Sequence, residues 1–121
     1  MSTLRVNTLQ DATGSNQPAM VGAAKAWVNF NGTGTVAIRA AFNVSSITDN
    51  GSGDYTVNFT NAMVDTNYTA TISVRDSGGW IGIISSGTFG SVFTTTSIRV
   101  EAYSPSTANT DNDYIGVVIF R

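Results

Sequence analysis

The hydrophobic residues of this chain recur with a period of two from residue 24 onward. Ala26, Val28 and Phe30 share one side of an extended chain, and the same spacing recurs in YTVNF (55–59) and SIRVEAY (97–103). Successive side chains of a β-strand point to opposite faces, whereas an amphipathic helix repeats every ~3.6 residues. No segment combines helical periodicity with a capping box and sufficient length. The pattern therefore predicts strands that each bury one face.

Turn residues mark where these strands end. An NGTG turn follows the first run, and its glycines allow the positive φ angles of a tight hairpin. The DNGSGD turn joins FNVSSIT to YTVNF in the clearest hairpin of the chain. In FNVSSIT the apolar phase slips between Val44 and Ile47, which predicts a bulge near Ser45 and Ser46.

About eight short strands are expected in all. We place them at KAWVNF, TVAIRAAFNV, FNVSSIT, YTVNF, NYTATISV, WIGII, SIRVEAY and YIGVVIF. The WIGII run is uniformly apolar, so we expect it to be buried on both faces. Short strands separated by Gly, Asn and Ser turns are typical of an all-β fold, here an antiparallel β-sandwich with a jelly-roll-like arrangement. This knob domain is expected to cover residues 21–121.

Residues 1–20 form a second region with a different pattern. STLRVNTLQ alternates, with Leu4 and Val6 on one face, and the polar segment DATGSNQPAM follows. A single strand of this length is not stable alone in water. We interpret it as an extended arm that becomes ordered against a neighbouring molecule, with Leu4, Val6 and Leu9 as its docking residues. A disordered tail is the alternative, because chain termini fray unless they are tied down.

The composition argues against several kinds of chemistry. The chain has no cysteine and no histidine, which removes disulfides, thiolate nucleophiles, the commonest general base and the commonest zinc ligand. Charged residues make up 12% of the chain, and its net charge is −2 with six basic residues scattered singly, so nucleic acid is not an expected partner. No apolar stretch is long enough to span a membrane or resembles a signal peptide, so we expect no membrane insertion.

Two of the expected strands carry apolar residues on both faces. Trp27 lies on the polar face of its strand, and Val118 and Phe120 lie opposite the other apolar residues of the last strand. A strand that is apolar on both faces must be covered twice. We expect a second copy of the chain to cover these residues, which makes Trp27, Val118 and Phe120 subunit-interface residues. Alternatively, loops 85–95 and 104–113 fold over them.

Two acidic turns are the candidates for metal binding or hydrolysis. Asp49 and Asp54 bound the DNGSGD turn, and Asp111 and Asp113 belong to a DND group. The first turn lacks the spacing and terminal glutamate of a calcium-binding EF-hand, and turn chemistry explains the same residues. A glycosidase needs two carboxylates ~5 to 9 Å apart across a cleft. Asp49 and Asp54 lie on a hairpin tip, so we expect neither a metal site, nor a cofactor, nor catalysis.

Aromatic residues in loops beside polar clusters are the candidates for receptor contact. Flat apolar rings next to hydroxyl and amide groups are surfaces on which sugar rings lie. Loops on a rigid scaffold commonly carry recognition. The candidates are Trp80, Phe89, Phe93, Tyr103 and Tyr114. The alternative for each of them is packing over an end of the sandwich.

Residues 1–84 also resemble a known family. The run KAWVNFNGTGT and the hairpin SITDNGSGDYTVNF are similar to the C-terminal knob module of bacteriophage tail fibres and related virion appendage proteins, notably of phages of cyanobacteria and other aquatic bacteria. The opening MSTLRVNTLQDATG is similar to the start of small structural proteins from the same phages. The resemblance is weak after residue 85. It implies a fibrous, usually homotrimeric protein whose β-rich tip contacts the host envelope.

Resemblance and composition together lead to one functional expectation. We expect a short tail fibre or receptor-binding appendage on the virion exterior, which docks on a larger tail, baseplate or capsid protein through residues 1–20 and adsorbs to host surface glycan. Weak single contacts would become strong when three tips engage together. The chain has no shaft, which departs from the fibre pattern. A capsid decoration or baseplate protein without a receptor role is therefore the alternative, and a small glycan-processing enzyme is a third.

Overall fold

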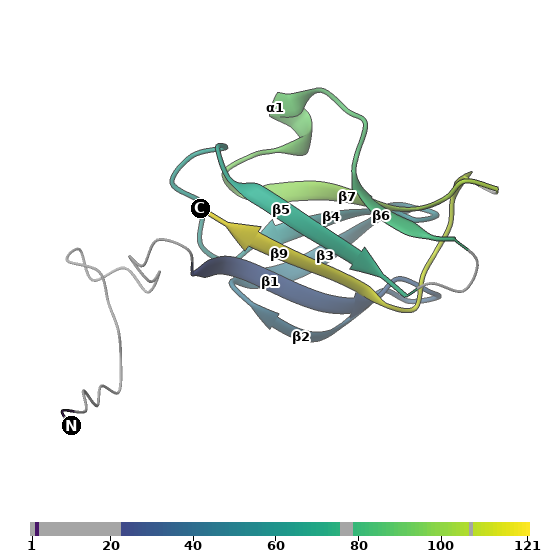
Figure 1. The fold of residues 1–121 in the computed structure, drawn as a ribbon, viewed down its shortest axis with the longest axis horizontal. Helices are drawn as coiled ribbons and strands as arrows, with labels where there is room; N and C mark the ends of the chain where they lie inside the picture. Colours follow the sequence, from purple (N-terminus) through teal and green to yellow (C-terminus); the bar gives the residue numbers. More distant parts are fainter. Residues whose placement is uncertain (1, 3–22, 76–78, 107) are drawn as a thin grey trace.

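The computed structural model describes residue 2 and residues 23–75, 79–106 and 108–121. Almost every element in these ranges is a strand, as Figure 1 shows. The elements are β1 (Ala24–Asn31), β2 (Ala37–Phe42), β3 (Val44–Gly51), β4 (Asp54–Phe59), β5 (Thr69–Val74), β6 (Ile81–Ile84), α1 (Phe89–Val92), β7 (Ser97–Ser104), β8 (Ala108–Asn109) and β9 (Ile115–Phe120). The expected all-β fold is confirmed.

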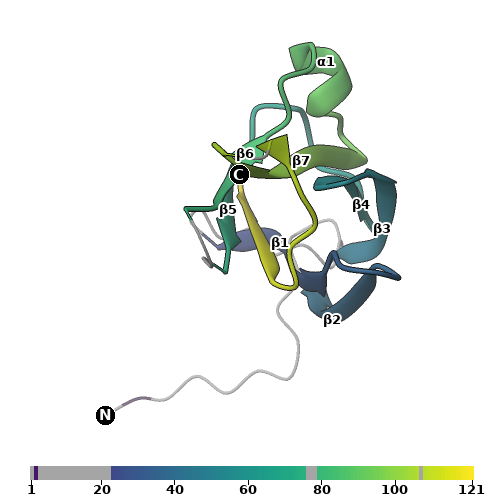
Figure 2. The same cartoon turned by 90° about the vertical axis from the view of Figure 1, so that its right-hand side faces the viewer.

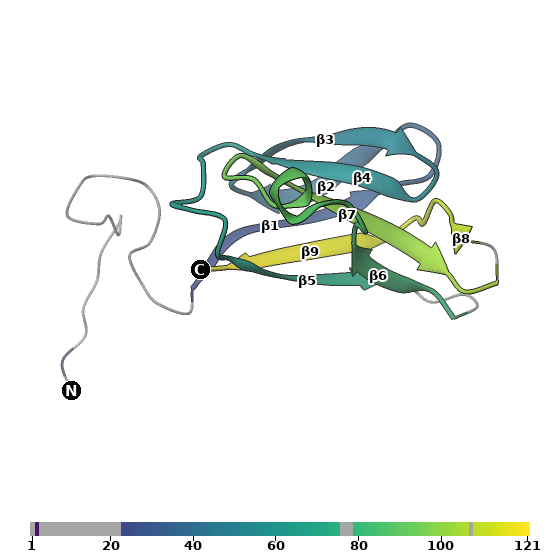
Figure 3. The same ribbon diagram turned by 90° about the horizontal axis from the view of Figure 1, so that it is seen from above.

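The strands form two antiparallel sheets that pack face to face (Figure 2, Figure 3). One sheet has the order β2-β1-β9-β5, and the other has the order β3-β4-β7-β6 with β8 paired to β7. Ala24 at the start of β1 pairs with Phe120 at the end of β9. The knob therefore starts and finishes at one end of the sandwich, and the turns that join β1 to β2 and β3 to β4 lie at the other end (Figure 1).

The core is built from the alternating residues that the sequence pattern singles out. Ala26, Val28 and Phe30 of β1 are at most 2% exposed, and the inward residues of β4 are at most 7% exposed. Phe30 meets Tyr55 edge to face across the two sheets, with ring centroids 5.2 Å apart. Each large apolar side chain that is buried in this way stabilises the fold by roughly 1.5–3 kcal/mol. The buried cluster consists of Ala26, Val28, Phe30, Tyr55, Val57, Phe59, Met63, Tyr68, Ile98, Val100, Ala102, Ile115, Val117 and Ile119.

One predicted strand is wrong, because the run TVAIRAAFNV is divided between the two sheets at Asn43. β2 ends one residue before Asn43 and β3 begins one residue after it. Asn43 has a φ of 54°, a left-handed conformation that asparagine adopts more readily than most residues. Its side-chain amide donates to the carbonyl oxygen of Lys25 at 3.0 Å and accepts from the backbone N–H of Asn61 at 2.8 Å. Asn43 is therefore the corner at which the chain changes sheets.

Two further expectations about single strands have opposite outcomes. The bulge near Ser45 and Ser46 is confirmed, because the register of β3 against β4 shifts between Val44 and Ser46. The expectation that WIGII is buried on both faces is wrong, since Ile81 is 46% exposed. Within its sheet β6 pairs with β7 alone. A uniformly apolar run therefore does not by itself identify a strand that is buried on both faces.

Candidate functional site

Three consecutive residues, Asp111, Asn112 and Asp113, fasten the loops at the end of the sandwich far from the start of β1. The carboxylate of Asp111 accepts the hydroxyl of Tyr55 at 2.9 Å and the backbone N–H of Gly53 at 2.8 Å. It thereby joins the chain between β8 and β9 to the turn between β3 and β4. The sequence marks these acidic residues only as turn formers, because nothing local indicates a partner so distant in the chain.

The next two residues extend this fastening to other loops. The backbone carbonyl of Asn112 accepts the N–H of Gly32 at 2.9 Å, and its side chain donates to the carbonyl oxygen of Arg75 at 2.9 Å. Asp113 pairs with the Arg75 guanidinium through two hydrogen bonds of 2.9 and 2.6 Å, which hold the pKa of Asp113 below its usual value. Loops that follow β1, β3 and β5 are therefore tied to a single segment.

The phenol of Tyr55 anchors this end in the core. Tyr55 has no exposed surface, and its hydroxyl also lies 3.0 Å from the carbonyl oxygen of Gly32. Burial raises the pKa of Tyr55 well above its usual value, and the neighbouring carboxylate of Asp111 raises it further. The hydroxyl therefore keeps its proton and acts as a permanent hydrogen-bond donor. This gives the loop end a fixed attachment to both sheets.

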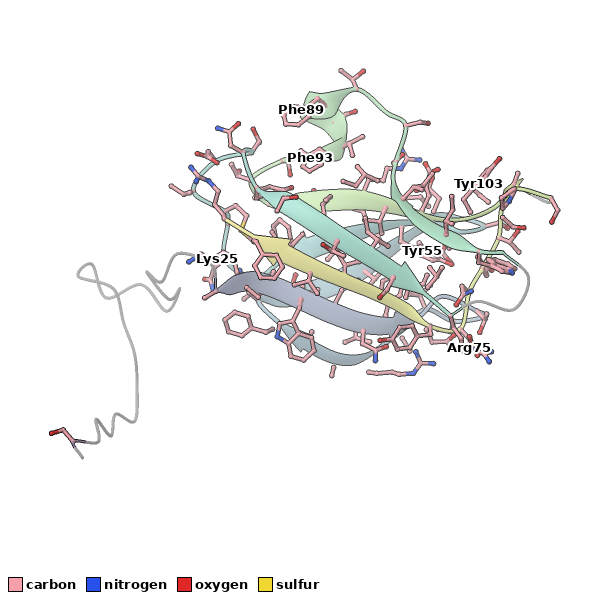
Figure 4. The ribbon with its side chains drawn as sticks, viewed as in Figure 1. Lys25, Tyr55, Arg75, Phe89, Phe93 and Tyr103 are labelled. Atoms are coloured by element: carbon pink, nitrogen blue, oxygen red, sulfur yellow. The ribbon has the colours of Figure 1, made fainter. Side chains whose placement is uncertain are left out.

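Three of the predicted receptor residues lie at or near this fastened end. Tyr103 lies on the outer face of the β3–β4–β7–β6 sheet, where it pairs with Ile81, and Figure 4 shows it at the same end as Arg75. Trp80 directly precedes β6 and is half-buried. Tyr114 is 39% exposed and lies against Gly116, where an added Cβ would be 3.7 Å from its ring.

Phe89 and Phe93 do not join this group. They lie on and directly after α1, away from Tyr103 (Figure 4). Phe89 is 57% exposed and stacks on Phe93, with ring centroids 4.9 Å apart. Phe93 in turn packs against Tyr68 of the core, with centroids 5.3 Å apart. The five candidate receptor residues thus occupy two separate regions of the surface.

The outer face of the β2–β1–β9–β5 sheet carries the predicted interface residues. Trp27 pairs with Val118 on one side and with Phe42 on the other, so the three form an apolar row across three strands. Trp27 is 38% exposed, Phe42 39% and Phe120 37%. The alternative that loops 85–95 and 104–113 bury these residues is wrong, because this exposure remains with the described parts of both loops in place.

Phe42 is the member of this face that sequence reasoning missed. It belongs to TVAIRAAFNV, which reads as one strand, and only the corner at Asn43 shows that Phe42 ends β2 beside Trp27. All six residues of β2 are exposed. β2 is thus an edge strand whose two faces both meet solvent.

The acidic turns of the sequence bind groups of the protein itself. Asp49 accepts the backbone N–H of Gly51 at 3.0 Å, which is ordinary turn chemistry. Asp54 forms a bidentate ion pair with Arg99, and this hydrogen bonding lowers the pKa of Asp54. Within the described ranges, no three His, Cys, Asp or Glu side chains gather as metal ligands. The two carboxylates are therefore partners in the fold at this hairpin.

Leu4, Val6 and Leu9, the expected docking residues, lie outside the described residues. No helix in the described part of the chain has the length and apolar character to cross a membrane.

Comparison with known proteins finds no relative of this chain. It matches no protein-family model, no curated protein and no solved structure.

Proposed function

We propose that this chain is a non-enzymatic appendage protein of a phage virion that adsorbs to host surface glycan. The observation that carries the proposal is that the two ends of the sandwich differ. β1 begins and β9 ends at the same end of the sandwich, where Ala24 pairs with Phe120. Tyr103 and the fastened loops lie at the other end (Figure 4). A domain that is attached at one end and presents rigid loops at the far end suits recognition of a large surface. The resemblance of residues 1–84 to fibre knobs supports the same reading.

The state of the carboxylates supports binding over hydrolysis. Asp111 and Asp113 hold loops together, and Asp54 is paired with Arg99. A retaining or inverting glycosidase needs one carboxyl with a raised pKa to act as general acid. The pKa of Asp54 and that of Asp113 are shifted in the opposite direction. Asp54 and Asp113 therefore stay ionised at neutral pH, and both are held in ion pairs.

We also propose that the copies assemble as a homotrimer through the outer face of the β2–β1–β9–β5 sheet. Phe42, Trp27 and Val118 form an apolar row on the surface. Exposed apolar patches commonly mark sites of contact with another protein. The row lies on the side of the sandwich and at neither end. Copies packed side by side about an axis parallel to the strands would point their loops in one direction, and three weak glycan contacts would then act together.

Native mass measurement tests the assembly. The natural chain should have the mass of a trimer, and Trp27→Ser should have the mass of a monomer with its fold retained. Ile81→Ser is the matched control, because Ile81 is also an exposed large apolar residue but lies on the other sheet. A natural chain that stays monomeric at high concentration would contradict the assembly.

Adsorption assays test the role on the particle. Soluble chain should compete with phage particles that carry it for adsorption to host cells, and deletion of residues 1–20 should release the protein from those particles. Protein that binds particles but does not compete would instead be a capsid decoration or baseplate protein. Turnover of host polysaccharide by the purified chain would contradict the non-enzymatic role.

A further inference from the structure

The outer face of the β3–β4–β7–β6 sheet carries a group of hydroxyl and amide side chains, which we call the hydroxyl–amide ladder. Alternation in β3 and β4 turns these residues away from the core. Thr48 pairs directly with Thr56, and Ser46 pairs directly with Asn58. The ladder consists of Ser46, Thr48, Asn50, Thr56 and Asn58.

Hydrogen bonds between side chains hold the ladder in one arrangement. The amide nitrogen of Asn58 donates to the hydroxyl oxygens of Ser46 and Thr48 at 3.1 and 2.9 Å. The amide nitrogen of Asn50 donates to the hydroxyl oxygen of Thr56 at 2.9 Å. These side chains have already lost the rotamer freedom that a ligand would otherwise have to remove, so binding to them costs less entropy.

The ladder still has unused hydrogen-bonding capacity. Ser46, Thr48 and Thr56 each accept an amide hydrogen, and within the described residues none of their hydroxyl protons is donated. Over the same residues the side-chain oxygens of Asn50 and Asn58 accept no hydrogen bond. Fixed donors therefore stand next to fixed acceptors. A sugar hydroxyl both donates and accepts, so vicinal hydroxyl groups match such a mixed array.

The charges around the ladder favour a neutral ligand. Arg99 is committed to the bidentate pair with Asp54, and Glu101 accepts the hydroxyl of Ser85 at 2.6 Å. These three charged groups sum to one negative charge, so among the described residues this face offers no unpaired cation to a phosphate, sulfate or carboxylate group. A metal ion would need acceptors alone, and the hydroxyl protons work against it.

We propose that the hydroxyl–amide ladder is the site at which this chain binds a neutral polysaccharide. The inference rests on the proposed function and locates its receptor contact on a sheet face instead of on loops alone. Ser46 to Asn50 span ~13 Å along β3, which is enough for more than one sugar ring. Tyr103 lies on the outer face of the same sheet and adds a flat apolar ring toward the loop end.

Affinity electrophoresis tests this inference with defined probes. The full chain is run through native gels that contain mannan, galactan, dextran or, as a charged comparison, dextran sulfate. The test variant is Thr48→Val with Thr56→Val, which removes two ladder hydroxyls and keeps side-chain shape and strand preference. The matched control is Thr35→Val with Thr60→Val, which makes the same change at two exposed positions outside both the ladder and the strands of the proposed assembly face.

Retardation of the natural chain by a neutral polymer, weakened about 10-fold in the ladder variant and unchanged in the control, is the expected result. Equal loss in both variants, or no loss in either, would overturn the inference, as would retardation by dextran sulfate alone. Urea unfolding of both variants must give the natural midpoint. The adsorption competition separates the two proposals: a ladder variant that competes as well as the natural chain refutes the ladder, whereas a natural chain that does not compete refutes the receptor role.

Discussion

The hydroxyl of Tyr55 lies 2.9 Å from the carboxylate of Asp111, 56 residues away in the sequence, and joins the core to the fastened loops. Tyr55→Phe keeps the ring but leaves the carboxylate and the carbonyl oxygen of Gly32 without this donor. We expect a loss of ~1–3 kcal/mol in the free energy of unfolding, measured by urea denaturation. Tyr103→Phe is the control and should change it by less than ~0.5 kcal/mol. Equal losses would show that the Tyr55 hydroxyl does not hold the loops.

Stability at alkaline pH should depend on the same hydroxyl. Burial raises the pKa of Tyr68 to about 12 and that of Tyr55 further, so the folded state favours the neutral phenols. This contribution is complete below the unfolded tyrosine pKa of ~10 and is lost as the pH rises through the folded values. The urea midpoint of the natural chain should therefore fall as the pH rises from about 10 to about 12. Tyr55→Phe should show a shallower fall, and an unchanged slope would contradict this account.

The sequence predicts the core well because alternation is a local signal. The period of two predicts that Val28 and Phe30 face inward, and it also assigns Tyr55 to the core. All three residues are buried. The hydrogen bond between Tyr55 and Asp111 could not be predicted, because Asp111 lies far along the chain. Turn formation alone also accounts for acidic residues at such a position. Local patterns identify faces, whereas contacts between loops depend on how the sheets are stacked.

The change of sheet at Asn43 escaped prediction for a related reason. The period of two runs through the corner without a glycine or proline, and alternation says nothing about which sheet a residue joins. For that reason the position of Phe42 beside Trp27 was not predicted. The hydroxyl–amide ladder could be predicted only in part. The alternation in β4 puts Thr56 and Asn58 on the outer face, but only the register with β3 shows which side chains form hydrogen bonds with them.

Two glycines of one turn give a matched test of close packing. Gly51 and Gly53 both have positive φ, at 131° and 64°. An added Cβ at Gly51 meets nothing within 4 Å, whereas one at Gly53 would lie 2.5 Å from the carbonyl oxygen of Ala102 and also collide with the backbone of Thr110. Gly53→Ala should therefore destabilise the fold by ~1–3 kcal/mol more than Gly51→Ala, measured by urea denaturation. Equal costs would mean that strain alone accounts for both.

The corner residue Asn43 combines a backbone conformation with three side-chain hydrogen bonds, one to Lys25 and two to Asn61, and two substitutions separate these roles. Asn43→Gly keeps the left-handed φ of 54° but removes the bonds to Lys25 and Asn61, and Asn43→Ala adds strain to the same loss. We expect Asn43→Gly to cost ~1–3 kcal/mol in the free energy of unfolding and Asn43→Ala to cost ~1–2 kcal/mol more. Urea denaturation of both variants measures the difference. If the two cost the same, the corner depends on the amide bonds alone; if neither costs anything, the chain turns between the sheets for another reason.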